Sequence, residues 1–155
     1  MRDSSSHTRN GVSTEIAEAF KARLLAAIPA LRDAGAPSGS KKIIQLSCPN
    51  PKIPEGLAIW MEGGTVPSLG FGPWQGHASL VGKKAEAGWD GLIDFAGAIL
   101  HDQLVLVRDG GWLQVLDLRD EDALEELLTS KFCSGGVEVL TWSGSGDRQV
   151  GLDDL

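Results

Sequence analysis

The sequence predicts a single α+β domain with three helices and a mainly antiparallel sheet. The chain has 155 residues, of which 42% are hydrophobic and 23% are charged, as in an ordinary packed globular domain. Apolar residues recur with helical spacing in three segments, and they cluster in short runs between those segments. Turns rich in glycine and proline separate the short runs, which favours antiparallel strand pairing.

The N-terminal part is expected to begin with a tail and a helix. Residues 1–12 are polar and rich in serine, so we expect a disordered tail followed by the domain over residues 13–155. Ser13 or Thr14 is a suitable cap for a helix with apolar residues at three- and four-residue spacing. Pro29 is expected to kink or end this helix.

Four strands are expected next, each a short apolar run bounded by turn residues. Gly72 and Pro73 are expected to separate the last two of them. The four predicted strands span residues 42–47, 57–62, 66–71 and 77–81.

The second half is expected to hold two helices, a hairpin and a final strand. Asp109-Gly110-Gly111 predicts the hairpin turn, because aspartate and glycine tolerate a positive φ. Gly144 and Gly146 are expected to open a flexible C-terminal end. The predicted helices are residues 83–100 and 120–129, and the predicted strands are residues 103–108, 112–118 and 137–142.

The charge is negative and unevenly distributed. The formal net charge is −7, with +3 over residues 1–60 and −10 over residues 61–155. Such an acidic chain is repelled by phosphate backbones, which argues against direct binding to nucleic acid. Asp120, Glu121 and Asp122 form either a solvated helix face or a docking surface for a basic protein.

Several classes of protein and site lack support in the sequence. No apolar stretch long enough for a membrane span and no secretory signal is present, so we expect a cytoplasmic protein. Cys48 and Cys133 are expected to be reduced thiols. No phosphate-binding glycine motif and no metal-ligand spacing is found, so no cofactor or metal is expected. The oligomeric state is not predicted.

Tryptophans and a histidine near glycine-rich loops are the candidate functional residues. Trp74, Trp142 and Trp112 are either anchors of a protein interface or residues that cap the sheet. His77 is expected on the same strand side as Gln75. Either His77 acts as a base oriented by Asp147, or it is a hydrogen-bonded histidine without a catalytic duty.

Two motifs resemble a known group of proteins. Residues 70–77 read Gly-Phe-x-x-Trp-x-x-His, and residues 142–147 read Trp-Ser-Gly-x-x-Asp. Both are similar to motifs of small bacterial proteins that resemble the immunity proteins of polymorphic toxin systems. The resemblance covers residues 55–150. Gln75 stands where the pattern has the first of two histidines, so no two-histidine metal or catalytic site is implied.

The resemblance and the acidic charge together imply a protein-binding module that neutralises a basic toxin, for example a nuclease. No catalytic residue is assigned on this interpretation. A small enzyme or ligand-binding protein and a structural adaptor are the alternative functions. The candidate binding residues are Trp74, Gln75, His77, Trp112, Asp120, Glu121, Asp122, Trp142 and Asp147.

Overall fold

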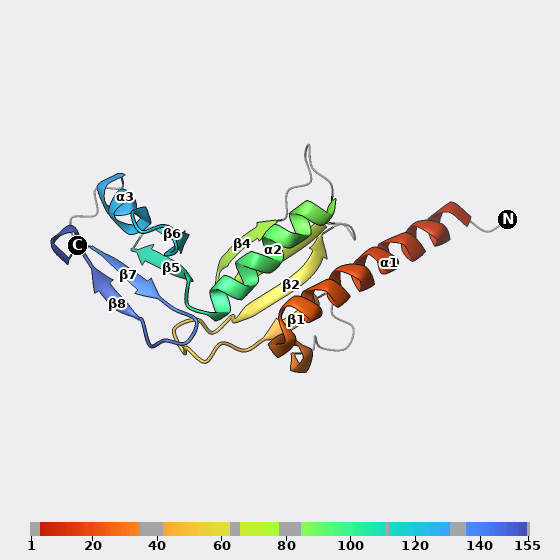
Figure 1. Cartoon of the computed structure of the whole chain (residues 1–155), viewed down its shortest axis with the longest axis horizontal. Helices are drawn as coiled ribbons and strands as arrows, with labels where there is room; N and C mark the ends of the chain where they lie inside the picture. Colours follow the sequence, from red (N-terminus) through yellow and green to blue (C-terminus); the bar gives the residue numbers. More distant parts are fainter. Residues whose placement is uncertain are drawn as a thin grey trace. The chain divides into compact units, whose positions relative to one another are not determined.

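The computed structural model describes residues 4–34, 42–62, 66–77, 85–110, 112–130 and 136–154. For residues 4–14, 85–87, Lys42, Glu62, His77 and Leu152 within these ranges, only the backbone is described. The described chain forms three α-helices and two antiparallel sheets of four strands each (Figure 1). This confirms the predicted α+β class. None of the helices in these ranges is long and apolar enough to cross a membrane.

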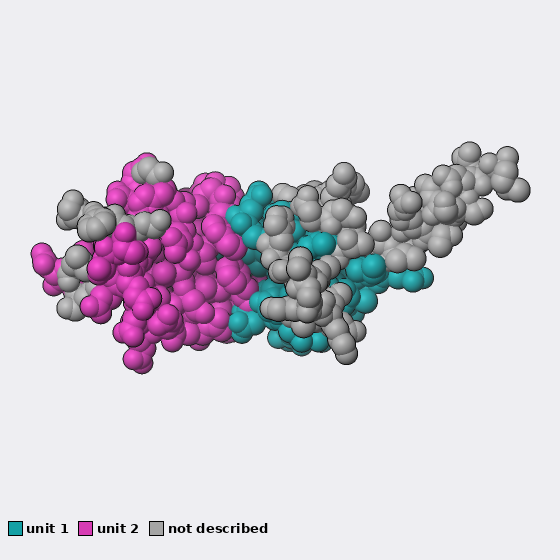
Figure 2. All heavy atoms as spheres, turned by 90° about the horizontal axis from the view of Figure 1, so that it is seen from above, with its two compact units in different colours: residues 1–46, 56–71, 75–94 teal, residues 47–55, 72–74, 95–155 magenta. Residues whose placement is uncertain are grey.

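The structure divides into two compact units, shown in teal and magenta in Figure 2. Unit 1 comprises residues 1–46, 56–71 and 75–94, and unit 2 comprises residues 47–55, 72–74 and 95–155. The region expected to form one domain, residues 13–155, therefore contributes to two units, which are described separately below.

Unit 1 contains the first helix and most of the first sheet. Helix α1 spans Ser4–Ala27, and a 3-10 helix, η1, follows over Pro29–Asp33, so Pro29 ends the α-helix as expected. The sheet has the order β1-β2-β3-β4, with strands at Lys42–Leu46, Leu57–Glu62, Val66–Phe71 and Trp74–His77.

The core of unit 1 is apolar and includes an aromatic pair. Phe20 and Leu24 of α1 are completely buried, as are Leu57 and Ile59 of β2. Trp89 packs its ring edge-on against Phe20, with the ring centroids 5.5 Å apart. The helical spacing of the apolar residues in the sequence therefore identified the buried side of α1.

Unit 2 contains a second sheet covered on one face by a helix. The strand order is β6-β5-β7-β8, with bounds of Trp112–Asp117, Leu104–Asp109, Val137–Leu140 and Arg148–Val150. Helix α3, Ala123–Ser130, packs its three buried leucines on this sheet. The core of this layer is formed by Val105, Val107, Leu116, Leu124, Leu127, Leu128, Val137, Val139 and Val150. The predicted hairpin is confirmed, because Asp109 pairs with Trp112 across the turn.

Several sequence predictions are wrong in detail. The helix expected over residues 120–129 begins at Ala123, and the strand expected over residues 137–142 ends at Leu140. Helix α1 begins at Ser4 rather than near Ser13, since no proline interrupts the residues expected to form the tail. The fourth strand is Trp74–His77 rather than residues 77–81, because the chain re-enters the sheet directly after Gly72, whose φ is 58°. Residues 78–81 lie outside the described ranges. Strand β8 was not predicted, since three residues are too few to show a period.

Helix α2 spans Ala85–Leu100 and contributes residues to both units. It confirms most of the helix predicted over residues 83–100. A second 3-10 helix, η2, covers Leu152–Asp154 near the C-terminus and lies beside α3. The C-terminal end of α2 lies in unit 2 and contributes to the site described below.

Candidate functional site

A buried amide joins two distant loops of unit 2. Asn50 is only 2% exposed. Its Nδ2 donates to the Thr141 carbonyl at 2.8 Å and to the two carboxylate oxygens of Asp147 at 2.9 and 3.1 Å. Its Oδ1 accepts from the Lys52 backbone N–H at 3.0 Å. The amide thus has a partner for its donors and for its acceptor, as a buried polar group requires.

The loop over residues 141–147 is folded around two polar side chains. The Asp147 carboxylate accepts from the Thr141 backbone N–H at 2.8 Å and from its hydroxyl at 3.2 Å. The Thr141 hydroxyl oxygen in turn accepts from the backbone N–H groups of Gly144 and Gly146, both at 3.1 Å. The end expected to be flexible is therefore an internally bonded loop.

The end of helix α2 holds the same loop from another side. Asp102 N–H donates to the Ile99 carbonyl and Gln103 N–H to the Ala98 carbonyl, which is the hydrogen-bond pattern of a Schellman helix end. Asp102 occupies the left-handed position of that motif, with φ 59°. Its carboxylate accepts from the Ser143 backbone N–H at 2.9 Å and from the Ser143 hydroxyl at 2.5 Å.

The thiol of Cys48 lies beside this loop and is free. It donates to the Trp142 carbonyl at 3.2 Å. Burial raises the pKa of the Cys48 thiol above its ordinary value, and the negative charges of Asp147 and Asp102 raise it further, against a lowering by the Asn50 backbone. A raised pKa disfavours the nucleophilic thiolate, so Cys48 has the character of a structural cysteine. Cys133 lies outside the described residues.

This set of contacts gives Asp147 a structural role. Its carboxylate is bonded to Asn50 and Thr141, so Asp147 holds two loops together. The side chain of His77 is outside the described part of the structure, and the pairing of His77 with Asp147 therefore stays a prediction. Gln75, on the same strand, is exposed.

The three candidate tryptophans are placed in different surroundings. Trp74 is half-buried and stacks on Phe95, with ring centroids 5.2 Å apart and the planes 15° from parallel. Trp142 is 7% exposed and belongs to the core of unit 2. Trp112 is half-buried at the start of β6 and lines a groove. Trp112 also packs against the apolar core beneath α3, so it combines a structural contact with a place in the groove lining.

The groove lies on the side of the sheet of unit 2 that faces away from α3. It has a volume of about 760 Å³ and is lined by Pro73, Arg108, Asp109, Gly110, Trp112, Leu113, Gly136, Glu138 and Gln149. Arg108 pairs across the strands with Leu113 on one side and Glu138 on the other, and Glu138 pairs with Gln149. These four side chains therefore form one row across the sheet.

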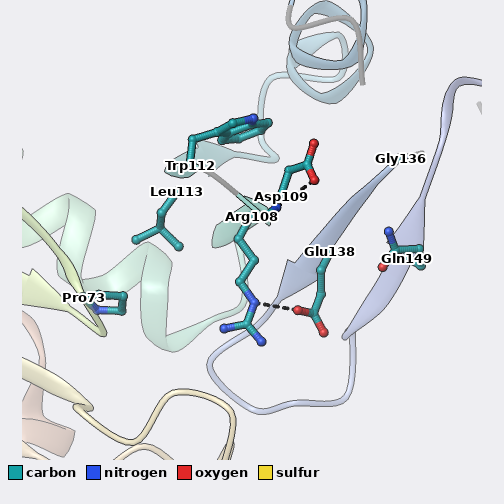
Figure 3. A pocket seen from close by; sticks show the side chains of 9 residues that line it. Pro73, Arg108, Asp109, Trp112, Leu113, Gly136, Glu138 and Gln149 are labelled. Atoms are coloured by element: carbon teal, nitrogen blue, oxygen red, sulfur yellow. Dashed lines mark hydrogen bonds and ion pairs between the residues drawn. The ribbon is translucent and has the colours of Figure 1, made fainter. Parts of the chain in front are cut away.

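An ion pair sits at the centre of this row. Figure 3 shows the Arg108 guanidinium turned toward the Glu138 carboxylate, with 2.6 Å between Nε and Oε1. Lys52 Nζ lies 3.2 Å from the other carboxylate oxygen. Hydrogen bonding by Arg108, assisted by Lys52, holds the pKa of Glu138 below its ordinary value, despite partial desolvation. The lining of the groove thus combines one cation, Arg108, with two carboxylates, Asp109 and Glu138, and Lys52 adds a second cation to the ion pair.

The predicted acidic segment is exposed. Asp120, Glu121 and Asp122 all lie on the surface directly before α3, and Glu125 and Glu126 continue the exposed acidic side along the helix. Asp120 has an additional local role, because its Oδ1 accepts from the Asp122 backbone N–H at 3.1 Å. The solvated-face and docking-surface interpretations both agree with this exposure.

Sequence reasoning missed two residues that organise the site. Asn50 lies between Pro49 and Pro51, a sequence that indicates a turn but not a buried amide. Asp102 follows the last turn of α2, where glycine is the usual left-handed residue, so the pattern gave no signal for its contact with Ser143.

Neither a metal cluster nor a relative assigns a chemistry to this site. Within the described ranges, no group of three or more histidine, cysteine, aspartate or glutamate side chains is placed to hold a metal ion. The polar side chains of the loops are bonded to one another. No protein-family model, curated protein or solved structure matches this chain. What the protein does must therefore be inferred from its own residues.

Proposed function

We propose that this protein is a binding module that acts in the cytoplasm as an immunity-like inhibitor of a basic protein toxin. The observation that carries the proposal is the charge of unit 2. This unit has five Lys or Arg and thirteen Asp or Glu residues, a formal net charge of −8, whereas unit 1 has a net charge of +1. Charge of one sign gathered in one unit favours a partner of the opposite sign.

The described ion pairs of unit 2 engage three of its cations, one of which, Arg119, directly precedes the acidic segment. Arg108 and Lys52 are bonded to Glu138, and Arg119 is bonded to Asp117 at 2.9 Å. These contacts leave the field of the exposed carboxylates before and along α3 to act on a partner. Complementary charge mainly raises the rate at which two proteins associate and rejects partners of the wrong sign.

The fixed loops of unit 2 support a binding role as well. Binding is tighter when a surface is already ordered, because less conformational entropy is lost on association. The bonds of Asn50, Asp147 and Asp102 order the loops of the acidic unit in this way. A nuclease groove is basic because it binds phosphates, so an acidic, ordered surface is suited to cover one. This supports a toxin of the nuclease class as the partner.

The proposal is tested with two charge-reversed variants of equal charge change. Glu121→Lys/Glu125→Lys changes the acidic segment and leaves Asp120, which bonds the turn, untouched. Glu15→Lys/Glu18→Lys is the matched control, because both residues are exposed on α1 in unit 1. Each variant and the unmodified protein are used to capture partners from a lysate of the host at low and at moderate salt. The captured protein is then expressed with and without this chain.

We expect one basic partner, lost at moderate salt, whose toxicity in cells is suppressed by co-expression of this chain. The acidic-segment variant should lower the association rate with the purified partner about tenfold at low salt, and the control should leave the rate unchanged. Equal rates for the two variants, or toxicity that persists on co-expression, would refute the proposal.

A further inference from the structure

Among the described residues, strand β6 is the end of its sheet and has a backbone edge that no other strand pairs with. Within the described chain β6 pairs with β5 alone. The Leu118 N–H donates to the Gln103 carbonyl at 2.8 Å, which sets the alternation of the ladder. Residues 112, 114 and 116 direct their backbone groups toward β5, so Leu113, Val115 and Asp117 direct their N–H groups to the free edge.

The two sides of this edge differ in chemistry. Leu113 and Val115 are half-buried and lie on the side that faces away from α3. On the other side, a hollow of about 360 Å³ runs between β6 and α3. It is lined by Gln114, Leu116, Ala123, Glu126, Leu127 and Ser130. One side of the edge is therefore apolar, and the other combines an apolar floor with a carboxylate.

The acidic wall of this hollow continues along α3. Asp122, Glu125 and Glu126 line a neighbouring depression on the same helix. A strand that lies beside β6 directs alternate side chains to the two sides of the sheet. Its residues on the α3 side would meet carboxylates, and its residues on the opposite side would meet Leu113 and Val115.

We propose that β6 receives an extended segment of a basic partner protein as an additional strand, with basic side chains toward Glu126 and apolar side chains toward Leu113 and Val115. The inference rests on the proposed function and names how the partner docks. The main-chain hydrogen bonds of such strand addition give affinity, and the alternate side chains give specificity.

The charge of unit 2 selects the basic partner over a second copy of this chain. Pairing of β6 with the β6 of another copy would bring two units of formal charge −8 together. The strand itself, Trp112–Asp117, has neither the lysine nor the proline that commonly protects a sheet edge from pairing. A basic extended segment satisfies both the free edge and the charge.

The test uses a capped peptide of alternating valine and lysine, as long as β6, titrated into the isotope-labelled full chain. Backbone amide resonances report where it binds. We expect the largest shifts at Leu113, Val115 and Asp117, whose N–H groups face the edge. A peptide of the same sequence with N-methylated valines should bind at least about tenfold more weakly, because it cannot complete the ladder.

Two proline variants separate the edge from general charge attraction. Val115→Pro removes an N–H that faces the free edge and spares the bonds to β5. Gln149→Pro is the matched control on β8, the opposite end strand, where the pairing of residues 148 and 150 with β7 leaves the N–H of residue 149 facing outward. Well-dispersed amide spectra verify that both variants fold.

Val115→Pro is expected to weaken peptide binding about tenfold and to abolish the shifts at Leu113 and Asp117. Gln149→Pro is expected to bind as the unmodified protein does. Glu126→Lys should weaken binding several-fold, since it reverses the charge of the hollow.

Three outcomes would each overturn the inference: resonance shifts confined to α3, peptide binding by Val115→Pro equal to that of the unmodified protein, or no resonance shifts at all. The capture experiment would then decide the proposed function by itself. A second outcome is that the peptide shifts the β6 amide resonances as expected, but the charge-reversed Glu121→Lys/Glu125→Lys variant captures the partner as well as the unmodified protein does. That outcome would retain the strand site and refute the basic-toxin proposal. The two failures are therefore distinguishable.

Discussion

The side-chain amide of Asn50 spans the carboxylate of Asp147, donating to both oxygens at 2.9 and 3.1 Å across 97 residues of sequence. Asn50 is almost completely buried. The pair joins the loop before β2 to the loop before β8 within unit 2. Thr141 is hydrogen-bonded to both residues of the pair, so the three residues form one polar cluster in this unit.

Removal of the Asp147 carboxylate should destabilise the fold. Asp147→Ala leaves the Asn50 amide and the Thr141 N–H without this acceptor, and unpaired buried donors cost about 2–3 kcal/mol in total. Asp153→Ala, at an exposed carboxylate of η2, is the control and should change the stability by less than about 0.5 kcal/mol. Urea denaturation measures both, and equal losses would contradict the role given to Asp147.

The left-handed backbone of Asp102 predicts an unusual order of stabilities. Asp102→Gly and Asp102→Ala both lose the bonds to Ser143, but glycine adopts the φ of 59° without strain. We therefore expect the glycine variant to be more stable than the alanine variant by about 0.5–1 kcal/mol. Ser143→Ala isolates the side-chain contact. Thermal unfolding that ranks alanine above glycine would contradict the helix-end geometry.

The ion pair in the groove predicts a dependence on pH. Arg108 and Lys52 lower the pKa of folded Glu138 below its ordinary value of 4.5, so the charged form is favoured in the folded state. The stabilisation is present above that ordinary pKa and is lost as the pH falls through the lowered folded pKa. Because the side chains are open to water, the effect is less than about 1 kcal/mol at neutral pH.

Glu138→Gln removes this titration while keeping the shape of the side chain. The Glu138→Gln variant should have a lower free energy of unfolding than the unmodified protein at neutral pH. This difference should shrink as the pH is lowered below about 4.5, because Glu138 in the unmodified protein then becomes protonated. A Glu138→Gln deficit that is constant between neutral and acidic pH would rule out the contribution of this pair.

Two glycines should respond to alanine in opposite directions. At Gly136 a Cβ atom would lie 2.6 Å from the Val150 carbonyl oxygen, and φ is 79°, so Gly136→Ala should cost about 2 kcal/mol or more. At Gly91, an exposed position in α2, no heavy atom lies within 4 Å of the added Cβ. Gly91→Ala should stabilise by about 1 kcal/mol. Chemical denaturation of the two single variants tests both signs.

The elements that the sequence predicted well are those set by local chemistry. The turn at Asp109 and Gly110 fixes the β5–β6 register, and the aspartate Oδ1 accepts from the Gly110 N–H at 2.8 Å within the turn itself. The leucines of α3 repeat at helical spacing and are buried as the period requires. Such signals lie within a few neighbouring residues.

The parts that were not predicted depend on distant contacts. Strand β8 exists because Arg148 and Val150 pair with β7, and nothing local in its three residues requires a strand. Division into two sheets is also set by long-range pairing. Asn50 became important only where the fold placed it against residues 141–147, so its neighbours in sequence did not reveal its role.

Only part of the candidate site was predicted, because the contacts between its loops join residues that are distant in the sequence. The exposure of Glu121 and Asp122 followed from charge, because carboxylates stay in water unless paired. The sequence offers Asp147 as a partner for His77, whereas the described partners of Asp147 are Asn50 and Thr141. The sequence identified a polar residue in a functional-looking loop, and only the fold assigned its contacts.

The free edge of β6 also bears on how this protein behaves in concentrated solution. An unprotected strand of this kind invites copies to join edge to edge into aggregates. At neutral pH, repulsion between the acidic unit 2 of one copy and that of another opposes this association. The carboxylates that suit a basic partner therefore also preserve colloidal stability. As the pH falls toward the ordinary carboxylate pKa of about 4, protonation weakens this repulsion and association through β6 becomes more favourable.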